Sequence, residues 1–588
     1  MKLAEQPFLI LDCQTTGATP QSAQILELGW YLAHSIEAKL KLPGNLQPQI
    51  KSRLLKQPDD QEVPMRIQRI TGISTAHMQE AHAPSAVVSE LLDDLNQKQV
   101  RFAIAHYAQF EQAFVNQLFA DHRPEQNLPF DFICTCQIAK RLYPDLPSRA
   151  IRALGGYFGF SLTEMKRSTC HVEATYFIWQ RLVADLAAIG ILEDEQLVDW
   201  LRQPIAKAAV KAKKNPYAIP MERLKRLDLP NSPGVYRMLS SDGRILYVGK
   251  ATSLKSRVNS YFRGRKGKDS KTKELISQIF DIAVEVVATP LEAALLETDL
   301  IKQYDPPYNR ALRQRGRVLK FFSHDFSQVS LQQDSVHSIG PFVSEGITPL
   351  IDFLQALQSE AYPVELFWGL ASPELIAKAF ALVLADGPLA TNRVEQLSVR
   401  RLMAIGMTMV RQEVNCLRAE RREQTRLKAA ADFEVDSAVE DCLTDGPNED
   451  SSDESGEELG DELDEEPREI DENDLVEMIY GILARSAKLH LQAKRLTCLL
   501  NSRITFCDAK VRRTLTFING QLVASEAAAE SNLCSNSPEL ALALTVTQRH
   551  DPAWLNLEID AYDRMRVLLT ELARVTLKDN GVTIFEMK

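Results

Sequence analysis

Hydrophobic and polar positions change their period along the chain. Between residues 6 and 186, short apolar runs such as FLILDC and ILELGWYLA alternate with segments of helical period such as FEQAFVNQLF. Short apolar runs are typical of buried strands, and their alternation with amphipathic helices is typical of an α/β sheet. We therefore predict an α/β domain at residues 1–190. A Lys- and Ala-rich connection follows, and we interpret residues 191–228 as a basic linker.

The pattern is more mixed after the first half of the chain. The run VLKFF predicts a strand, and SPELIAKAFALVLADG predicts a helix that Ser372 caps and Gly387 ends. We assign residues 313–430 to an α+β region. In a second α+β region, at residues 475–588, a basic amphipathic helix precedes the strand-like RITFCD and TLTFING and the helical AWLNLEIDAYDRMRVLLTELARV.

An acidic stretch separates these two regions and dominates the net charge of -11. Residues 432–474 contain 21 Asp and Glu against one basic residue, Arg468, so the rest of the chain carries -11 + 20 = +9. A segment so charged and so poor in aromatic residues cannot bury enough apolar surface to fold. We predict that residues 431–474 form a disordered linker.

A basic helix precedes the acidic stretch. It runs from Val414 to Lys428 with four arginines, and it could contact phosphates or be a solvated face. If the acidic stretch covers it by mimicking DNA, deletion of residues 432–474 should tighten DNA binding.

The sequence gives no sign of a membrane or an oxidising compartment. No run of about 18 apolar residues is present, and the N-terminus does not resemble a secretory signal. The nine cysteines lack paired spacing, and we interpret Cys134 and Cys136 as packing residues. We expect a cytoplasmic location and no membrane partner.

Two tyrosines lie in the stretch GVYRMLSSDGRILYVGKA. Ser-Asp-Gly between two β-prone runs predicts a hairpin, because the glycine accepts positive φ. The hairpin places Tyr236 and Tyr247 on adjacent strands. Gly249 would let a backbone or phosphate approach, and Lys250 would add positive charge. In the helical LEAALLETDLIKQY, Glu297 shares an apolar face and needs a cation or metal as its partner.

Five ordered segments extend this motif: PGVY, LYVGKA, LKSRVNSYF, EAALLETDLIKQYDPPYN and RVLKFF. Together they resemble the GIY-YIG nucleases of the UvrC/Cho excinuclease family, and we place such a small α/β domain at residues 229–312. SIGPFVSEG at residues 338–346 resembles the segment that follows the nuclease in this family, so we interpret the α+β region at 313–430 as Cho/UvrC-like. The resemblance implies that Glu297 holds one divalent ion, Mg²⁺ or Mn²⁺. It implies also that Tyr236 and Tyr247 act as or orient the base, and Arg257 clamps the phosphate. Gly249, Lys250 and Asn309 would support the site or bind DNA.

The chemistry agrees with these roles. Phosphodiester cleavage needs charge neutralised on the phosphate and a deprotonated nucleophile. A tyrosine with a reference pKa of about 10 can serve as a base only if nearby cations such as Lys250 favour the phenolate.

The N-terminal region resembles the DnaQ-type 3′ to 5′ exonucleases in the segments ILDCQTTG, RITGIS, AIAHYAQFEQAF, AKRLYPDLPSRAIRALGGYFG and KRSTCHVEAT. The resemblance implies an RNase H-like fold and a two-metal site of four carboxylates with a histidine base. Asp12 matches, but Gln14 replaces a glutamate and Glu111 replaces an aspartate. One alignment puts Lys166 at the base position and His171 at the last acid.

Sliding that alignment makes His171 the base and leaves Tyr176 at the last acid. In both cases only Asp12 and Glu111 remain to balance two divalent ions, which repel unless anionic ligands surround them. We predict a retained fold without two-metal catalysis. A single metal at Asp12, Glu111 and His171 would leave weak activity, which soaking with manganese would reveal.

The resemblance implies a DNA-repair endonuclease similar to Cho. Such an enzyme nicks one strand of damaged double-stranded DNA near a lesion in nucleotide excision repair, and UvrA and UvrB are its candidate partners. One alternative is a dual nuclease with an additional active 3′ to 5′ exonuclease. The other is a non-catalytic DNA-binding scaffold.

Overall fold

The computed structural model describes residues 1–36, 49–58, 63–96, 100–160, 165–204, 219–263, 269–309, 312, 317–359, 372–386, 398–412, 471–508, 511–527, 557–579 and 582–586. The chain forms two compact units, Met1–Arg313 and Gln314–Lys588. The predicted basic helix and nearly all of the predicted acidic linker lie outside the described residues, as does Gly387.

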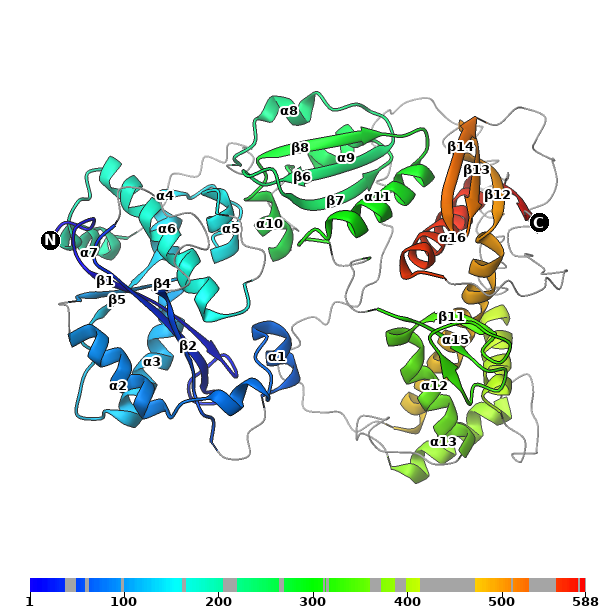
Figure 1. Ribbon diagram of the computed structural model, residues 1–588, viewed down its shortest axis with the longest axis horizontal. Helices are drawn as coiled ribbons and strands as arrows, with labels where there is room; N and C mark the ends of the chain where they lie inside the picture. Colours follow the sequence, from blue (N-terminus) through cyan, green and yellow to red (C-terminus); the bar gives the residue numbers. More distant parts are fainter. Residues whose placement is uncertain are drawn as a thin grey trace, which may run out of the picture. The chain divides into compact units, whose positions relative to one another are not determined.

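A five-stranded sheet forms the centre of the N-terminal region (Figure 1). Its order is β3-β2-β1-β4-β5, with antiparallel pairing of β1 to β2 and parallel pairing of β1 to β4. The strands are β1 (Phe8–Thr15), β2 (Ile25–Ala33), β3 (Lys51–Leu54), β4 (Phe102–Ala105) and β5 (Asp131–Cys134). The run FLILDC forms β1 because every one of its side chains is buried, as the continuous apolar pattern predicts.

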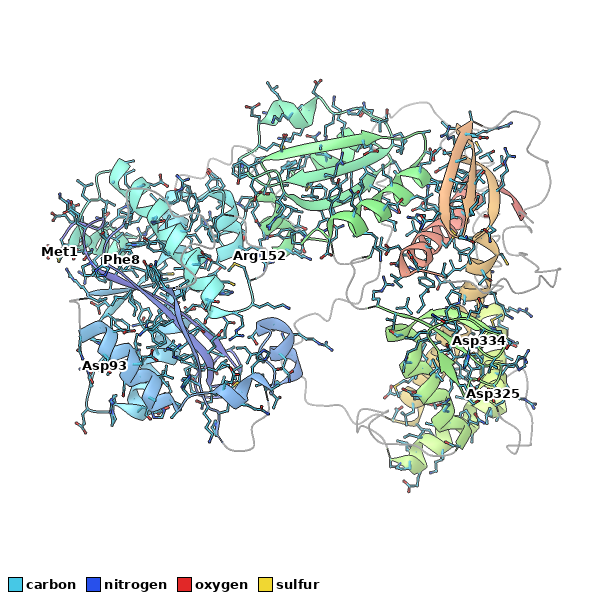
Figure 2. The ribbon with its side chains drawn as sticks, viewed as in Figure 1. Met1, Phe8, Asp93, Arg152, Asp325 and Asp334 are labelled. Atoms are coloured by element: carbon cyan, nitrogen blue, oxygen red, sulfur yellow. The ribbon has the colours of Figure 1, made fainter. Side chains whose placement is uncertain are left out.

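Helices cover both faces of this sheet, because successive strand residues point to opposite sides. Leu9 and Leu11 pack against the side of α2 (Pro84–Asn96) and α3 (Ala108–His122). Phe8, labelled in Figure 2, packs against Trp179 of α6 (Ser168–Ala188). The remaining helices are α1 (Met65–Thr71), η2 (His77–Glu80), α4 (Thr135–Leu142), α5 (Ile151–Tyr157) and α7 (Asp194–Arg202).

A second, antiparallel sheet of order β7-β6-β8 follows in the first unit. The predicted hairpin is β6 (Gly234–Leu239) and β7 (Ile245–Ala251), and Gly243 in its turn has φ of 79°. The third strand is β8 (Asp281–Val286). One face carries α9 (Leu254–Ser260) and α10 (Ser270–Ile276), and the other carries α11 (Pro290–Tyr304). The short α8 (Arg223–Leu227) precedes the hairpin.

The second unit contains two sheets. The first, of order β10-β9-β11, consists of β9 (Leu319–Phe322), β10 (Val329–Ser330) and β11 (Ile339–Val343). It is accompanied by α12 (Ser344–Ser359), α13 (Pro373–Asp386), a helix at 399–412 and α15 (Glu472–Leu499). The Ser372 hydroxyl accepts a hydrogen bond from Leu375 N at 3.3 Å, as the predicted cap requires.

The second sheet of this unit has the order β14-β13-β12-β15. Its elements are β12 (Ser502–Asp508), β13 (Val511–Ile518), β14 (Gln521–Ala527), α16 (Ile559–Asp579) and β15 (Val582–Glu586). The basic amphipathic helix predicted after the acidic stretch therefore forms as α15, and RITFCD and TLTFING lie on β12 and β13. The predicted final helix begins later than expected, at Ile559. Among the described residues of both units, no helix is long and apolar enough to cross a membrane.

Candidate functional site

The two tyrosines of the hairpin lie on one face of the second sheet. Tyr236 is paired with Gly249 in the register of β6 and β7, and Tyr247 is two residues before Gly249. Side chains two apart share a face, so the two rings are neighbours with centroids 6.1 Å apart. The side chain of Tyr236 is fully buried.

Gly249 is needed because Tyr236 occupies the space above it. A Cβ at position 249 would lie 2.4 Å from the Tyr236 Oη and 2.8 Å from the Tyr247 Cε1. The expectation was that the missing side chain would admit another backbone or a phosphate. In the structure the phenol of the same hairpin takes that place, so the glycine sets the position of the tyrosines.

Tyr261 joins this pair and was not singled out from the sequence. Its hydroxyl is 2.9 Å from the Tyr236 hydroxyl, and its ring lies 6.3 Å from that of Tyr247. The guanidinium of Arg257 on α9 lies 5.7 Å from the Tyr261 ring centroid, within the range of a cation–π contact. The spacing of four residues from Arg257 in a helical segment was the signal that could have identified Tyr261.

Glu297 reaches the same strand from the other face of the sheet. It is half-buried on α11, and its Oε1 accepts a hydrogen bond from the backbone N–H of Lys250 at 3.0 Å. Lys250 itself is exposed. The edge strand β7 therefore carries the tyrosines on one face and receives the carboxylate from the other.

Asn309 fixes this edge strand. Its side-chain Oδ1 accepts from Val248 N at 3.0 Å, and its Nδ2 donates to Val248 O at 2.9 Å. The buried amide thus satisfies both backbone groups of the residue between Tyr247 and Gly249. Its contacts in the structure support the strand and do not by themselves indicate a DNA contact.

Burial keeps the phenols neutral. It raises the pKa of Tyr236 well above its ordinary value, and the neighbouring Tyr261 and Tyr247 raise it further. The pKa of Tyr247 is raised by burial first, then by Tyr261 and by the negative charge of Glu297. The electrostatic effect of Glu297 on Tyr247 shows that the carboxylate and this phenol act on each other. Glu297 opposes the phenolate and Arg257 favours it, but burial has the largest effect on the pKa, so the phenolate needs more positive charge than Arg257 supplies.

The N-terminal sheet holds a second set of polar residues around Asp12 on β1. The Asp12 Oδ2 accepts a hydrogen bond from Gln14 Nε2 at 2.9 Å, and its Oδ1 lies 3.1 Å from His171 Nδ1 on α6. Burial lowers the pKa of His171, but the charge of Asp12 and the hydrogen bond to it outweigh burial and raise that pKa overall. Both Asp12 oxygens are thus bonded by side chains of the chain itself.

Glu111 and Lys166 differ in their relation to this group. Glu111 on α3 is 5% exposed, and burial together with the charge of Asp12 raises its pKa well above the ordinary value. Lys166 is exposed, and its side chain lies over the position that a Cβ of Gly72 would take. The structure brings His171, and not Lys166, against Asp12. Tyr176 is buried in the core among Phe8 and Tyr31.

A cavity of about 1010 Å³ opens beside Asp12. Its lining includes Asp12, Gln14, Glu111 and His171 from the predicted set, and Lys166 is not among its lining residues. Cys134 and Cys136 also line it and are buried free thiols. The cavity therefore brings four of the five predicted residues of this domain together.

The two sites differ in their fitness for metal ions. Mg²⁺ is commonly held by one or two carboxylates, waters and substrate phosphates, and Glu297, oriented by Lys250 N–H, suits such a single ion. The Asp12 group does not fit two ions, because Gln14 and His171 bond both Asp12 oxygens and Glu111 favours its neutral form. In the part of the chain that the structure describes, no three His, Cys, Asp or Glu are grouped to hold a metal.

Family models match the chain in both regions. A UvrC-like GIY-YIG domain matches residues 232–310, and an exonuclease domain matches residues 9–171. The chain therefore carries a UvrC-like GIY-YIG domain after an N-terminal exonuclease-type domain, and its architecture is mixed α/β. The predicted family resemblances are confirmed, while the boundaries and site residues stay predictions.

Individual relatives cover only parts of the chain. The UvrABC system protein C of Psychrobacter sp. (strain PRwf-1) is 53% identical over 102 residues, which is 17% of this chain and 16% of that protein. A Mycobacterium tuberculosis protein provisionally named a bifunctional exonuclease/endonuclease is 27% identical over 361 residues, 58% of this chain and 51% of that protein. The chain spans 14% to 20% of the length of several curated UvrC relatives.

Solved structures resemble the two regions separately. The magnesium-bound GIY-YIG domain of Thermotoga maritima UvrC is 35% identical, with a TM-score of 0.14, and covers 15% of this chain and 94% of that domain. Exonuclease X in complex with 5′ overhanging duplex DNA is 18% identical, with a TM-score of 0.24, and covers 33% of this chain and 99% of that protein.

Proposed function

We propose that the chain is a DNA-repair endonuclease that makes a divalent-metal-dependent incision in one strand of damaged duplex DNA. The observation that carries the proposal is the meeting of Tyr236, Tyr247, Arg257 and Glu297 at the edge strand β7. Mg²⁺ or Mn²⁺ held by Glu297 would supply positive charge to the phosphate and lower the pKa of a bound water. The names of the UvrC relatives support UvrA and UvrB as partners that prepare the DNA.

The chain's own residues divide the remaining work. The Lys250 N–H fixes one oxygen of Glu297, so the carboxylate is oriented before substrate binds. Arg257 presents two or more N–H donors to the scissile phosphate, and the ring of Tyr261 restricts the position of its guanidinium. Tyr247 orients the attacking water and accepts its proton only when bound positive charge lowers the pKa of the phenol.

The exonuclease domain is proposed to keep its fold without two-metal catalysis. Gln14 and His171 occupy the Asp12 oxygens that would otherwise bind ions, and Glu111 is biased toward the acid form. A dual nuclease is the main alternative, and the assay for it is release of mononucleotides from a labelled 3′ end. The scaffold alternative predicts no nicking by either domain.

The test is incision of a 5′-labelled duplex that bears one lesion, with Mg²⁺ or Mn²⁺, and with or without UvrA and UvrB. Glu297→Gln should lower the incision rate by about 10²–10³-fold, the usual effect of losing one electrostatic group at a reaction centre. Glu285→Gln is the matched control, because Glu285 is exposed on β8, at the opposite edge of the same sheet. Equal rates for wild type and Glu297→Gln would contradict the proposal.

A further inference from the structure

Three segments of the second unit bring two exposed cations and an exposed histidine together. His324 lies in the turn after β9, Arg400 lies near the start of the helix at 399–412, and Lys494 lies on α15. The guanidinium of Arg400 is 3.1 Å from the His324 Nδ1. We call His324, Arg400 and Lys494 the basic surface.

The buried ring beneath this surface links its members. His490 on α15 packs against Phe326 and Phe342, with centroids 6.3 and 6.5 Å away. Burial first, and then the charges of Lys494 and Arg400, lower the pKa of His490 to about 4. Lys494 lies one turn beyond His490 on α15, and Phe326, which packs against His490, is two residues from His324. The ring of His490 therefore lies beneath the three members of the surface, since Arg400 contacts His324.

Acidic partners for these cations are missing among the residues described in this unit. The ion pairs of the unit join other residues, such as Arg317 with Asp563 and Arg574 with Asp508. Asp325, labelled in Figure 2, accepts from the Ser323 hydroxyl at 2.6 Å and the Ser327 hydroxyl at 2.8 Å. The pKa of Asp325 falls to about 2 because of those serine donors, so its carboxylate is charged and its hydrogen bonds stabilise the turn.

The positions of the two cations in the basic surface do not stabilise the fold. Cations that share a surface repel one another, and a cation in the first turn of a helix opposes the helix dipole. From Met478 to Cys507 the sequence contains no Asp or Glu, although Lys and Arg recur through it. An external anion would relieve this repulsion.

We propose that the basic surface binds the sugar-phosphate backbone of duplex DNA and gives the chain a DNA contact outside the nuclease site. This inference rests on the proposed function, because the duplex DNA proposed as the substrate of the GIY-YIG domain is the polyanion that would reach the basic surface. Arginine and lysine are the usual phosphate ligands, and phosphates follow one another closely along a duplex. The acidic stretch at 432–474 is the competing occupant.

The helix α15 supplies a matched control. Lys494 and Arg485 are both exposed on it and are nine residues apart, which at 100° per residue places them on opposite faces. Alanine at either position removes one positive charge from the same helix. Only Lys494 belongs to the basic surface.

The experiment measures binding of a fluorescent lesion-bearing duplex by anisotropy across a range of salt. The full chain carries Glu297→Gln and no divalent metal is added, so that cleavage does not interfere. Loss of one phosphate contact should make the slope of log K against log salt shallower by about 0.9. That corresponds to a loss of affinity of roughly eightfold at 0.1 M salt. We expect this result for Lys494→Ala and for Arg400→Ala. Lys494→Arg should retain the slope, and Arg485→Ala should change affinity less than twofold.

Three outcomes would overturn the inference: unchanged slopes for both variants, an equal loss for Arg485→Ala, or tighter binding of Lys494→Ala, which would identify the acidic stretch as the occupant. Far-UV circular dichroism and thermal unfolding of each variant distinguish lost contacts from lost structure. The proposed function is judged separately, by incision with wild type against Glu297→Gln. Either result can therefore fail without the other.

Discussion

The side-chain amide of Gln14 donates a hydrogen bond of 2.9 Å to the Asp12 carboxylate. A glutamate at this position would place a second negative charge there and call for a cation between the two carboxylates. The amide instead satisfies Asp12 directly, so the two side chains form a hydrogen-bonded pair that needs no cation between them.

Gln14→Glu should therefore destabilise the metal-free protein by about 1–3 kcal/mol, because it replaces a donor with a like charge in a buried group. In a Glu297→Gln background, Mn²⁺ should raise the thermal midpoint of Gln14→Glu and leave that of the Gln14 parent unchanged. Differential scanning calorimetry with and without Mn²⁺ measures both. A clear Mn²⁺ shift in the parent would show that the native group binds metal after all.

Glu111 predicts a dependence of stability on pH. Its folded pKa is raised, so its neutral form stabilises the fold fully below the unfolded value of about 4.5, and this contribution is lost as pH rises toward the folded pKa. Each unit of the shift corresponds to about 1.4 kcal/mol. Glu111→Gln should thus unfold at a higher temperature than wild type at pH 7.5, with a smaller difference at pH 4.5. A difference that is independent of pH would contradict this assignment.

Gly249→Ala should destabilise the hairpin by about 1–3 kcal/mol, because the new methyl group overlaps the Tyr236 hydroxyl. Incision should fall with it, since both phenols must move. Tyr236→Phe removes the overlapping oxygen but leaves the ring carbon Cζ, which is 2.5 Å from the added Cβ. The double variant should therefore lose less stability than the sum of the two single changes, without recovering it fully. Urea unfolding of the four proteins gives the coupling, and strict additivity would mean that the overlap is relieved elsewhere.

Tyr261→Phe should slow incision by roughly tenfold, because Tyr236 loses a hydroxyl partner while the ring beneath Arg257 remains. Tyr247→Phe should cost more, about 10²–10⁴-fold, if its hydroxyl takes part in proton transfer. Single-turnover rates at saturating Mg²⁺ compare the two. If Tyr261→Phe lowered the rate more than Tyr247→Phe, the hydroxyl of Tyr261, and not that of Tyr247, would be assigned to proton transfer.

Deletion of residues 432–474 should tighten DNA binding, because it removes a net charge of -20 that competes with the substrate for basic residues. Affinity is measured for the deleted and complete chains at matched salt. A charge-neutral linker of equal length separates the loss of charge from the loss of length. Unchanged affinity would dismiss competition by this stretch.

The sequence was sufficient for the elements whose signals are local. The continuous apolar run of β1, the Ser-Asp-Gly turn of the hairpin and the helical period around Glu297 all depend on neighbours within a few residues, and all three form as predicted. The bond between Lys250 N and Glu297 joins residues 47 apart, and the choice between His171 and Lys166 depends on how α6 crosses β1. Such contacts are fixed by packing between elements, which periodicity does not describe.

The amide of Asn309 has a consequence for the behaviour of the protein at high concentration. Strand β7 is an edge strand, and an edge with free N–H and C=O groups can recruit a strand from another molecule. Because Asn309 and the N–H of Tyr308 occupy the backbone groups at Val248 and Leu246, this part of the border is closed to intermolecular pairing. These hydrogen bonds thereby oppose aggregation through strand β7, which also positions the tyrosines of the candidate site.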